Sequence, residues 1–335
     1  MIARYAIPFF LLMAFVVVPL LVFFLCRWLL PRRWGRKTGI ALAAVLMAFA
    51  LYGMLVGYEQ LEIHQVEYVS DELPDAFDGY RIVQFSDAHV GTMTGRRQWL
   101  MQRAVDSILA QHADMIVFTG DLQNIVPDEL VPHLTQFRRL HAPDGVYSVL
   151  GNHDYAVYQT GDSLTKLANC EKTKALQRQA GWTLLLNEHR VIRRPRTTAE
   201  ADSVSRYDSI VIGGMESWGV VSHMPRQGDV HKTLEGIDSS AFVVMLQHDP
   251  TAWRLRILPA CHAQLTLSGH THGGQFELFG WSPASFTYKE WAGTTYEGSR
   301  ALHVSTGLGA LIPFRLGLPG EIVVVTLRKG KHATP

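Results

Sequence analysis

The sequence contains few cysteines, and this limits the chemistry that it can support. Its 335 residues include only three, and no two of them form a CxxC pair: Cys26, Cys170 and Cys261. A disulfide-rich scaffold, a thiolate zinc ribbon and a thioredoxin-like redox centre are therefore excluded. Any metal site in this chain must be built from histidine and carboxylate ligands.

Charge is also scarce in the sequence. Only 18% of the residues are charged and the formal net charge is +1, so the composition gives no support for nucleic acid as a partner. In contrast, 47% of the residues are hydrophobic, which is ample for a buried core. The length allows one large domain or two ordinary ones, and we find no internal repeat.

Two stretches near the N-terminus contain no charged residue at all. They are 6–26 (AIPFFLLMAFVVVPLLVFFLC) and 38–57 (TGIALAAVLMAFALYGMLVG). A helix of about 20 residues crosses the hydrocarbon core of a bilayer, about 30 Å thick. We expect a membrane anchor over residues 1–58 with helices at about 6–30 and 38–57. For the first run, a cleaved signal peptide and a buried core helix are the alternatives.

The segment between these two runs is basic, and the segment after them is acidic. RWLLPRRWGRK occupies 27–37, whereas 58–74 has a net negative charge. Short basic loops remain cytoplasmic, so we expect the tip of the helical hairpin to face the cytoplasm. The remainder of the chain would then lie on the outer face of the cell (inner) membrane. A single span would reverse this orientation.

The rest of the sequence predicts a polar linker at 59–79 and one domain at 80–330. Apolar runs typical of strands occupy 81–87, 114–121, 145–154, 182–192, 209–214, 241–249, 263–272, 301–307 and 321–327, and we expect 182–192 to be a strand pair. Helical stretches occupy 96–111, 128–140 and 164–180, and we expect 193–208 to be a mobile polar loop. This alternation predicts an α/β layered architecture whose second half is mostly β.

Polar side chains follow five of the apolar runs. They lie in SDAH, GD, GNHD, QHDP and GHTH and comprise Asp87, His89, Asp121, Asn152, His153, His248, His270 and His272. One such residue alone is usually a cap or turn residue. Five strand ends that all carry metal-ligand side chains indicate a shared site at one edge of a sheet.

Two divalent cations about 3.5–4 Å apart need a bridging anion, and the carboxylate of Asp121 suits that position. Asp87 and His89 could bind one cation, and Asn152 and His248 the other, with the two GHTH histidines divided between them. Without thiolates, the ligand set favours manganese, with iron and zinc as alternatives.

In this order, the motifs resemble those of the calcineurin-like metallophosphoesterase family over about 80–327. The segments GHTHGGQ (269–275) and 305–327 are similar to the membrane-linked bacterial branch of that family. The resemblance implies a four-layer α/β/β/α sandwich preceded by two transmembrane helices. It also implies two sets of metal ligands, Asp87, His89, Asp121 and His272 for one ion and Asp121, Asn152, His248 and His270 for the other.

The predicted activity is metal-dependent hydrolysis of a phosphodiester or pyrophosphate, lipid-linked or related to the cell envelope. A water between the two cations would lose a proton near neutral pH and attack phosphorus in line. With Asn152, His153 is the candidate catalytic residue, as the proton donor to the leaving oxygen. The alternative is a metal-binding scaffold of the same fold that recruits protein partners.

The sequence departs from the family pattern at Asn124. Family members often have an aspartate there, three residues after the GD aspartate, which orients the catalytic histidine. A carboxamide can accept a hydrogen bond from the ring, but it stabilises an imidazolium less than a carboxylate does. The activity or its pH optimum could therefore differ from the family norm.

An aromatic segment at 276–298 contains the candidates for substrate contact. Its rings either pack on their own domain as a hairpin or lie among lipid headgroups beside an entrance for a lipid-borne phosphate. The candidate residues are Trp281 and Trp291 in this segment and Arg96 elsewhere. For Arg96, a solvated surface charge is the alternative.

Overall fold

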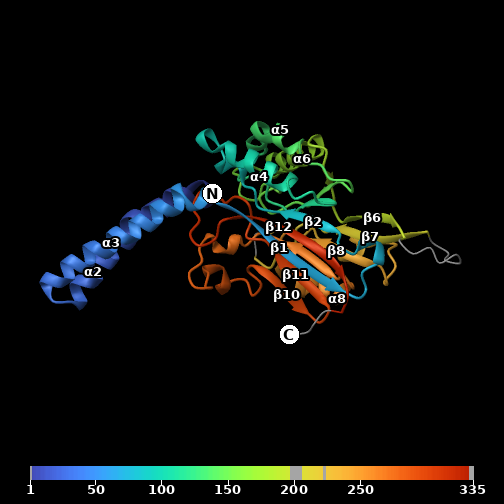
Figure 1. Ribbon diagram of the computed structural model, residues 1–335. Helices are drawn as coiled ribbons and strands as arrows, with labels where there is room; N and C mark the ends of the chain where they lie inside the picture. Colours follow the sequence, from blue (N-terminus) through green and yellow to red (C-terminus); the bar gives the residue numbers. More distant parts are fainter. Residues whose placement is uncertain (1, 197–205, 222–223, 332–335) are drawn as a thin grey trace.

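The computed structural model describes residues 2–196, 206–221 and 224–331, and it has two parts (Figure 1). A pair of long antiparallel helices projects from a domain built on two β-sheets. The N-terminus lies beside the domain, on the side from which the helical pair projects.

The helical pair contains both apolar stretches. The first helix leads away from the domain and consists of α1 (Ile2–Leu12), a π-helical turn (Met13–Val17) and α2 (Val18–Leu29). The second helix, α3 (Arg32–Leu55), leads back to the domain. The most apolar 18 residues of Ala6–Leu29 have a mean hydropathy of 3.0, and those of Arg32–Glu59 have a mean hydropathy of 2.3. Only 6% of the first stretch and 17% of the second are buried. Both are long and apolar enough to cross a membrane, and their exposure contradicts the core-helix alternative for the first run.

The basic segment between the two runs is helical, where the sequence predicted a loop. α3 begins at Arg32, so four basic residues lie in its first two turns: Arg32, Arg33, Arg36 and Lys37. Pro31 has the fixed φ that suits the residue before a helix. A Cβ at Gly39 would lie only 3.0 Å from the carbonyl oxygen of Phe23. Glycine there, about two helical turns into α3, lets the two helices approach closely.

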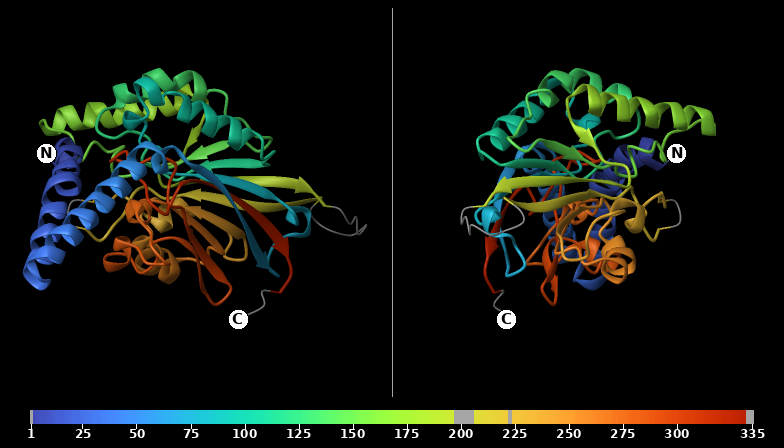
Figure 2. Two further views of the ribbon diagram at one scale, coloured as in Figure 1. Left: turned by 60° about the vertical axis from the view of Figure 1, so that its left-hand side comes forward. Right: turned by 90° about the vertical axis from the view of Figure 1, so that its right-hand side faces the viewer.

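The first sheet has the strand order β1-β12-β2-β3-β4-β5. The bounds are β1 Leu61–Ser70, β12 Gly320–Lys329, β2 Arg81–Phe85, β3 Met115–Phe118, β4 Val146–Ser148 and β5 Thr183–Leu184. Strands β2 to β5 are parallel, and β12 runs antiparallel to β2. The helices α4 (Trp99–Leu109), α5 (Leu134–Phe137) and α6 (Ser163–Gln179) cover its outer face (Figure 2).

The second sheet has the order β10-β11-β9-β8-β7-β6. The bounds are β10 Gly293–Glu297, β11 Arg300–Val304, β9 Leu265–Ser268, β8 Phe242–Leu246, β7 Tyr207–Gly214 and β6 Glu188–Pro195. α7 (Val230–Thr233), a π-helical turn (Trp253–Ile257) and α8 (Leu258–Ala260) lie on its outer side, where Trp253 is fully buried.

The central strands are buried on both faces, and this explains their continuous apolar sequences. One hydrophobic cluster fills the space between the sheets and includes Ile82, Val117, Ile212, Val244 and Val323. Separate clusters lie under the helices of each outer layer. The architecture is the four-layer α/β/β/α sandwich that the resemblance implied.

The segment predicted as a linker forms part of the domain. Within 59–79, β1 pairs in parallel with β12 over ten residues, and the η3 turn (Asp75–Phe77) follows it. The polar residues that suggested a linker lie mostly on the exposed side of this edge strand, whereas Tyr68 and Phe77 are buried. An edge strand tolerates such polarity because only one side of it is paired.

Three other predicted elements differ in detail. The run 182–192 does not form a strand pair, because β5 belongs to the first sheet and β6 to the second. The predicted loop 193–208 is partly strand, in β6 and β7, and its residues 197–205 lie outside the described residues. The stretch 128–140 is the 3-10 helix η6 (Pro127–His133) followed by the short α5.

Candidate metal centre

The predicted ligand residues converge at one end of the two sheets. Asp87 and His89 follow β2, and Asp121 follows β3; Asn152 and His153 follow β4, His248 follows β8, and His270 and His272 follow β9. Their ligand atoms form three overlapping groups, each within 4.8 Å: Asp87, His89 and His272; His89, Asp121 and His153; Asp121, His248 and His270. Asn152 joins them, since its Oδ1 lies 3.1 Å from His248 Nε2.

The backbone at this edge adopts unusual conformations. Five of the ligand residues have φ between 43° and 74°: Asp87, His89, Asp121, His270 and His272. Non-glycine residues with such φ values cost free energy and concentrate at functional sites. The glycines of the motifs allow the close approach, because a Cβ at Gly269 would collide with the side chains of Ser86 and Asp87. A Cβ at Gly151 would collide in the same way with the carboxylate of Asp121.

Asp121 lies between two sets of imidazoles. Its Oδ2 is 3.2 Å from His248 Nε2 and 3.8 Å from His89 Nε2. Its Oδ1 accepts a hydrogen bond of 2.8 Å from the main-chain N–H of His153, which fixes the orientation of the carboxylate. The carboxylate is therefore placed as the bridging ligand of a two-metal centre would be.

The imidazole nitrogens meet at distances that suit a shared cation. His89 Nε2 lies 3.1 Å from His272 Nε2, and His248 Nε2 lies 3.1 Å from His270 Nδ1. His248 Nδ1 is 2.8 Å from the carbonyl oxygen of Thr119, which can only accept, so this nitrogen carries the proton. Burial alone would lower the pKa of His248, but the carboxylate of Asp121 raises it to about 10, so Nε2 would release a proton when it binds a metal.

Among the described residues, the buried carboxylate oxygens without a hydrogen-bond partner include Oδ1 of the candidate ligand Asp87. Asp87 is fully buried and its Oδ1 accepts no hydrogen bond, although His272 Nε2 lies 3.5 Å away. Burying such an oxygen without a partner is costly unless a cation compensates it. Because the donors are carboxylate, amide and imidazole, these residues fit a pair of divalent ions such as manganese, iron or zinc.

The electrostatics of the centre favour ligation. Burial lowers the pKa of His89 well below its usual value and lowers that of His272 to about 4, so both rings are neutral at pH 7. Burial alone would raise the pKa of Asp121, but the rings of His248 and His153 lower it by a larger amount. The net pKa of Asp121 is therefore well below its usual value. Neutral imidazole and ionised carboxylate are the protonation states that bind metal.

His153 is oriented by a main-chain group and not by a side chain. Its Nδ1 donates to the carbonyl oxygen of Asn124 at 2.5 Å, and its ring packs on Tyr158 with centroids 4.3 Å apart. The Asn124 carboxamide, which we expected to accept this hydrogen bond, has an Oδ1 without a partner among the described residues. The substitution at position 124 therefore leaves the orienting contact of His153 in place.

Two residues that the sequence analysis did not assign to the site support it. Asp154 is fully buried and accepts hydrogen bonds from the main-chain N–H groups of Asp121, Gly151 and Leu122, at 2.8 to 3.0 Å. It joins the two loops that carry Asp121 and Asn152, and its place in GNHD was the available signal. The Tyr288 hydroxyl lies 2.8 Å from His270 Nε2, and nothing in the sequence pointed to this contact.

A cavity of about 290 Å³ opens over these residues. Its walls include Tyr158, Met224, Gln275, Tyr288 and Leu311. The three predicted substrate contacts are absent from its described lining. Trp281 lies in an exposed turn, Trp291 is partly buried beside Gly273, and Arg96 is exposed in the turn η5 (Gly95–Arg97).

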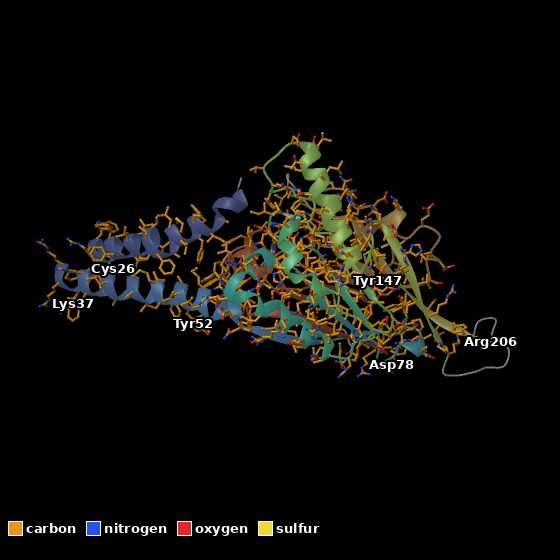
Figure 3. All side chains as sticks on the ribbon, turned by 90° about the horizontal axis from the view of Figure 1, so that it is seen from above. Cys26, Lys37, Tyr52, Asp78, Tyr147 and Arg206 are labelled. Atoms are coloured by element: carbon orange, nitrogen blue, oxygen red, sulfur yellow. The ribbon has the colours of Figure 1, made fainter. Side chains whose placement is uncertain are left out.

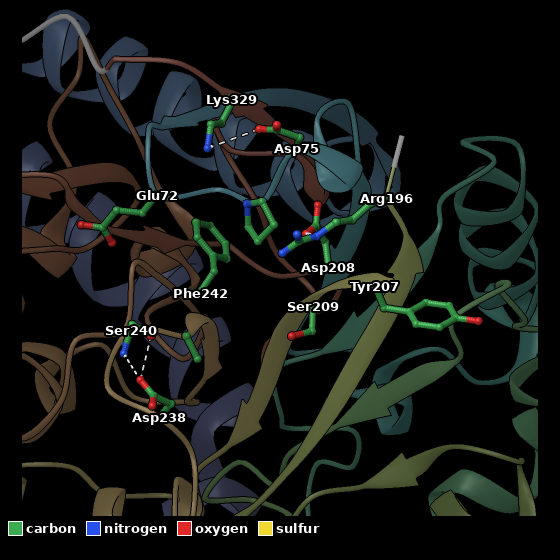
Figure 4. A pocket seen from close by; sticks show the side chains of 12 residues that line it. Glu72, Asp75, Arg196, Tyr207, Asp208, Ser209, Asp238, Ser240, Phe242 and Lys329 are labelled. Atoms are coloured by element: carbon green, nitrogen blue, oxygen red, sulfur yellow. Dashed lines mark hydrogen bonds and ion pairs between the residues drawn. The ribbon is translucent and has the colours of Figure 1, made fainter. Parts of the chain in front are cut away.

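A larger cavity, of about 590 Å³, has a different character (Figure 4). It contains two ion pairs within the chain: Arg196 Nε with Asp208 at 2.8 Å and Lys329 Nζ with Asp75 at 3.4 Å. No histidine occurs among the described residues that line it. Size alone would therefore select the wrong cavity as the candidate site.

Comparison with known proteins identifies the family that this chain matches. The family model described as calcineurin-like phosphoesterase matches residues 80–274. A transmembrane protein with metallophosphoesterase domain from Danio rerio is 28% identical over 299 residues, which are 88% of this chain and 63% of that protein. The chain thus spans less than two thirds of the length of that relative.

Two bacterial relatives match over nearly their whole length. The uncharacterized metallophosphoesterase YkuE of Bacillus subtilis is 30% identical over 306 residues, covering 87% of this chain and 94% of that protein. The UDP-2,3-diacylglucosamine pyrophosphatase LpxG of Chlamydia trachomatis is 26% identical over 326 residues, covering 85% of this chain and 95% of that protein.

Proposed function

Because the chain belongs to the calcineurin-like phosphoesterase family, we propose that it is a membrane-anchored hydrolase that cleaves a phosphodiester or pyrophosphate with two divalent cations. One observation carries the proposal. A single buried carboxylate, that of Asp121, lies between two groups of imidazole and carboxylate ligands that come from five strand ends.

We assign the ligands as the resemblance implied. One cation would be held by Asp87, His89, Asp121 and His272, and the other by Asp121, Asn152, His248 and His270, with manganese as the first candidate. When bound, the two cations would activate a water molecule and neutralise charge on the phosphoryl oxygens. The protein holds these ligands rigidly, since Asp154 fixes the Asp121 loop and Thr119 fixes the tautomer of His248.

His153 is the proposed proton donor to the leaving oxygen. Its Nδ1–H is committed to the carbonyl of Asn124, so the ring would act as an imidazolium whose second proton, on Nε2, passes to the leaving oxygen. The ring borders the cavity and is not needed as a ligand in the proposed assignment. A positioned acid of this kind contributes about 10²–10⁴ in rate.

The proposed substrate is lipid-borne, and the proposed location of the domain is the outer face of the inner membrane. The name of LpxG describes a pyrophosphatase of a diacylated sugar nucleotide, and this chain has two helices suited to span a bilayer. Figure 3 places Cys26 and Lys37 at the end of the helical pair remote from the domain. Basic residues gather at that end, and basic segments remain cytoplasmic.

The catalytic proposal is tested with the detergent-purified full chain. After chelation and reloading with manganese, iron or zinc, we expect metal-dependent hydrolysis of bis(p-nitrophenyl) phosphate. His153→Ala should lower kcat by about 10² or more with the metal content unchanged. His141→Ala, at an exposed position that does not line the cavity, is the matched control.

The outcomes separate the candidate functions. Bound metal without turnover of any ester would favour the scaffold alternative. Turnover by His153→Ala at the wild-type rate would remove that residue from the mechanism. A panel of lipid-linked pyrophosphates, phospholipids and soluble nucleotides would then define the substrate class.

A further inference from the structure

Four apolar side chains near the metal centre are exposed together in one short segment. They form what we call the aromatic tip: Leu278, Phe279, Trp281 and Phe286. Phe279 is 99% exposed and Phe286 is 81% exposed. Exposed apolar clusters of this kind mark surfaces that contact a partner or a membrane.

The backbone of the tip is a tight hairpin that projects Phe279 outward. Leu278 and Trp281 exchange two main-chain hydrogen bonds, of 2.9 and 3.1 Å. The two residues between them, Phe279 and Gly280, have φ of 53° and 79°. A left-handed conformation is normal for glycine but unfavourable for phenylalanine. Since the ring is almost fully exposed, contacts within the described chain do not compensate that conformation.

The tip is attached to the segment that receives the membrane helices. The main chain of Glu277 and Gln275 pairs with Leu316 at 2.9 and 3.0 Å, and Gln275 Nε2 donates to the carbonyl of Phe314 at 2.6 Å. The ring of Phe314 packs against Phe10 of α1, with centroids 4.8 Å apart. Arg315 N–H donates to the carbonyl of Gly53 in α3 at 3.1 Å.

The two ribbon views agree with this connection. In Figures 1 and 2, the orange turns of this segment lie beside the domain end of the helical pair, on the side of the domain from which the helices project. If the helices span a bilayer, its surface lies next to the tip.

We propose that the aromatic tip inserts into the headgroup region of the same bilayer that contains the helices. The inference rests on the proposed membrane anchoring, and it deepens the proposed function because the tip is continuous with the cavity. Tyr288, two residues after Phe286, lines the cavity, as do Gln275 and Leu311. An inserted tip would hold this wall of the cavity at the level of lipid phosphates.

The bilayer is the occupant that the tip suits best. Residues 278–286 (LFGWSPASF) contain no charged side chain, and tryptophan and phenylalanine are favoured at the membrane interface. The surface is also directly continuous with the segment that contacts α1 and α3. A second copy of the chain or another protein is a competing occupant that the experiment detects.

Photocrosslinking tests the location of the tip without relying on catalysis. Benzoylphenylalanine is placed at position 279 in the full chain, which is reconstituted in nanodiscs of phosphatidylethanolamine and phosphatidylglycerol. We expect a lipid adduct after irradiation. The same probe at position 164 in α6, where Leu164 is 72% exposed, should give none. An adduct with a second copy of the chain, or no adduct at position 279, would overturn the proposal.

A kinetic arm tests the role in substrate access. Phe279→Ser with Phe286→Ser should lower kcat/KM for a vesicle-borne phosphodiester about tenfold. Hydrolysis of bis(p-nitrophenyl) phosphate should remain within about twofold, and the melting temperature should not change. Leu164→Ser with Leu167→Ser is the matched control, since both leucines are exposed in α6. Equal losses on both substrates would reject this role. If the wild type hydrolysed neither substrate, the proposed function would fail while the crosslinking result would still stand.

Discussion

The contact that orients His153 determines what a change at position 124 should do. Because the acceptor is the main-chain carbonyl of Asn124, the carboxamide can be removed without losing it. We expect Asn124→Ala to keep kcat for bis(p-nitrophenyl) phosphate within about threefold of wild type. A hundredfold loss, comparable to that expected for His153→Ala, would show that the side chain is the orienting group.

A second residue-scale prediction concerns an ion pair between two strands of the first sheet. His64 Nδ1 in β1 lies 2.7 Å from Glu321 Oε1 in β12. Hydrogen bonding to Glu321 raises the pKa of His64 to about 9. Burial raises the pKa of Glu321, but the hydrogen bond with His64 and other contacts lower it to about 2.

These shifts define the pH window of the stabilisation. The raised pKa of His64 means that its contribution is complete below about pH 6.5 and is lost as the pH rises through about 9. The lowered pKa of Glu321 means that its contribution is present above about pH 4.5 and is lost as the pH falls towards 2. The pair is therefore strongest near pH 5 to 6.5.

The measurement is the melting temperature of wild type and His64→Gln in detergent between pH 5 and 10. We expect the wild type to be more stable at pH 6, and the difference to shrink by pH 10. Since the His64 side chain is half exposed, the gain should be about 1 kcal/mol or less. A difference that stays constant across this range would show that the pair does not titrate in this way.

At the scale of elements, the connection between β11 and β12 depends on one buried guanidinium. Arg315 is fully buried and donates hydrogen bonds to the carbonyls of Thr306, Gly307 and Gly309 at 2.6 to 2.8 Å. Burial lowers its pKa to about 10, so it remains charged at pH 7. The same connection supports the metal centre, because Gly309 N–H donates to the carbonyl of Asp87 at 2.8 Å.

Replacing this arginine should therefore affect both stability and metal affinity. Arg315→Met leaves three buried carbonyls without this donor, and at about 1–3 kcal/mol for each we expect a loss of about 3 kcal/mol or more of stability. Arg315→Lys should lose less, because it keeps the charge but not the fork of donors. Melting temperature and manganese titration measure the two effects. A variant Arg315→Met with unchanged stability and affinity would refute the role.

The convergence of the candidate ligands was predictable because the strands before them are buried on both faces. The ends of continuous apolar runs such as those of β2, β3 and β9 can be located in the sequence. The polar residue after each run must lie at the edge of a sheet where the strands end. β1 was not predictable in this way, because it carries the exposed polar residues Glu62, His64 and Glu67, which are typical of a linker. The main-chain acceptor of His153 was also not predictable, because every residue has a carbonyl and nothing in the sequence marks that of Asn124.

At the scale of the whole molecule, a buried turn connects the helical pair to the domain. α3 passes through the turn η2 (Gly57–Glu59) directly into β1, and Tyr58 of that turn is 3% exposed in the cluster under α4. Arg97 pairs with Glu59 at 3.2 Å and donates to the carbonyl of Met54 at 2.5 Å. The domain is therefore held in one orientation relative to its helices.

This continuity predicts where the chain can be cut. A chain that begins at residue 57 keeps Tyr58 and β1, and we expect it to fold and to hydrolyse bis(p-nitrophenyl) phosphate while losing preference for a vesicle-borne ester. A chain that begins at residue 80 lacks β1 and four large buried side chains: Tyr58, Tyr68, Leu73 and Phe77.

Each of those four side chains is worth about 2–5 kcal/mol when removed, so together they amount to about 8–20 kcal/mol, which is as large as the usual stability of a domain, about 5–15 kcal/mol. The shorter chain would also expose β12 as a new sheet edge, which invites aggregation. We therefore expect it to be insoluble, as measured by soluble yield and circular dichroism. If the chain that begins at residue 80 folded with an unchanged melting temperature, β1 would not contribute to the stability of the domain. The connection from α3 into β1 would then not set the orientation of the catalytic domain.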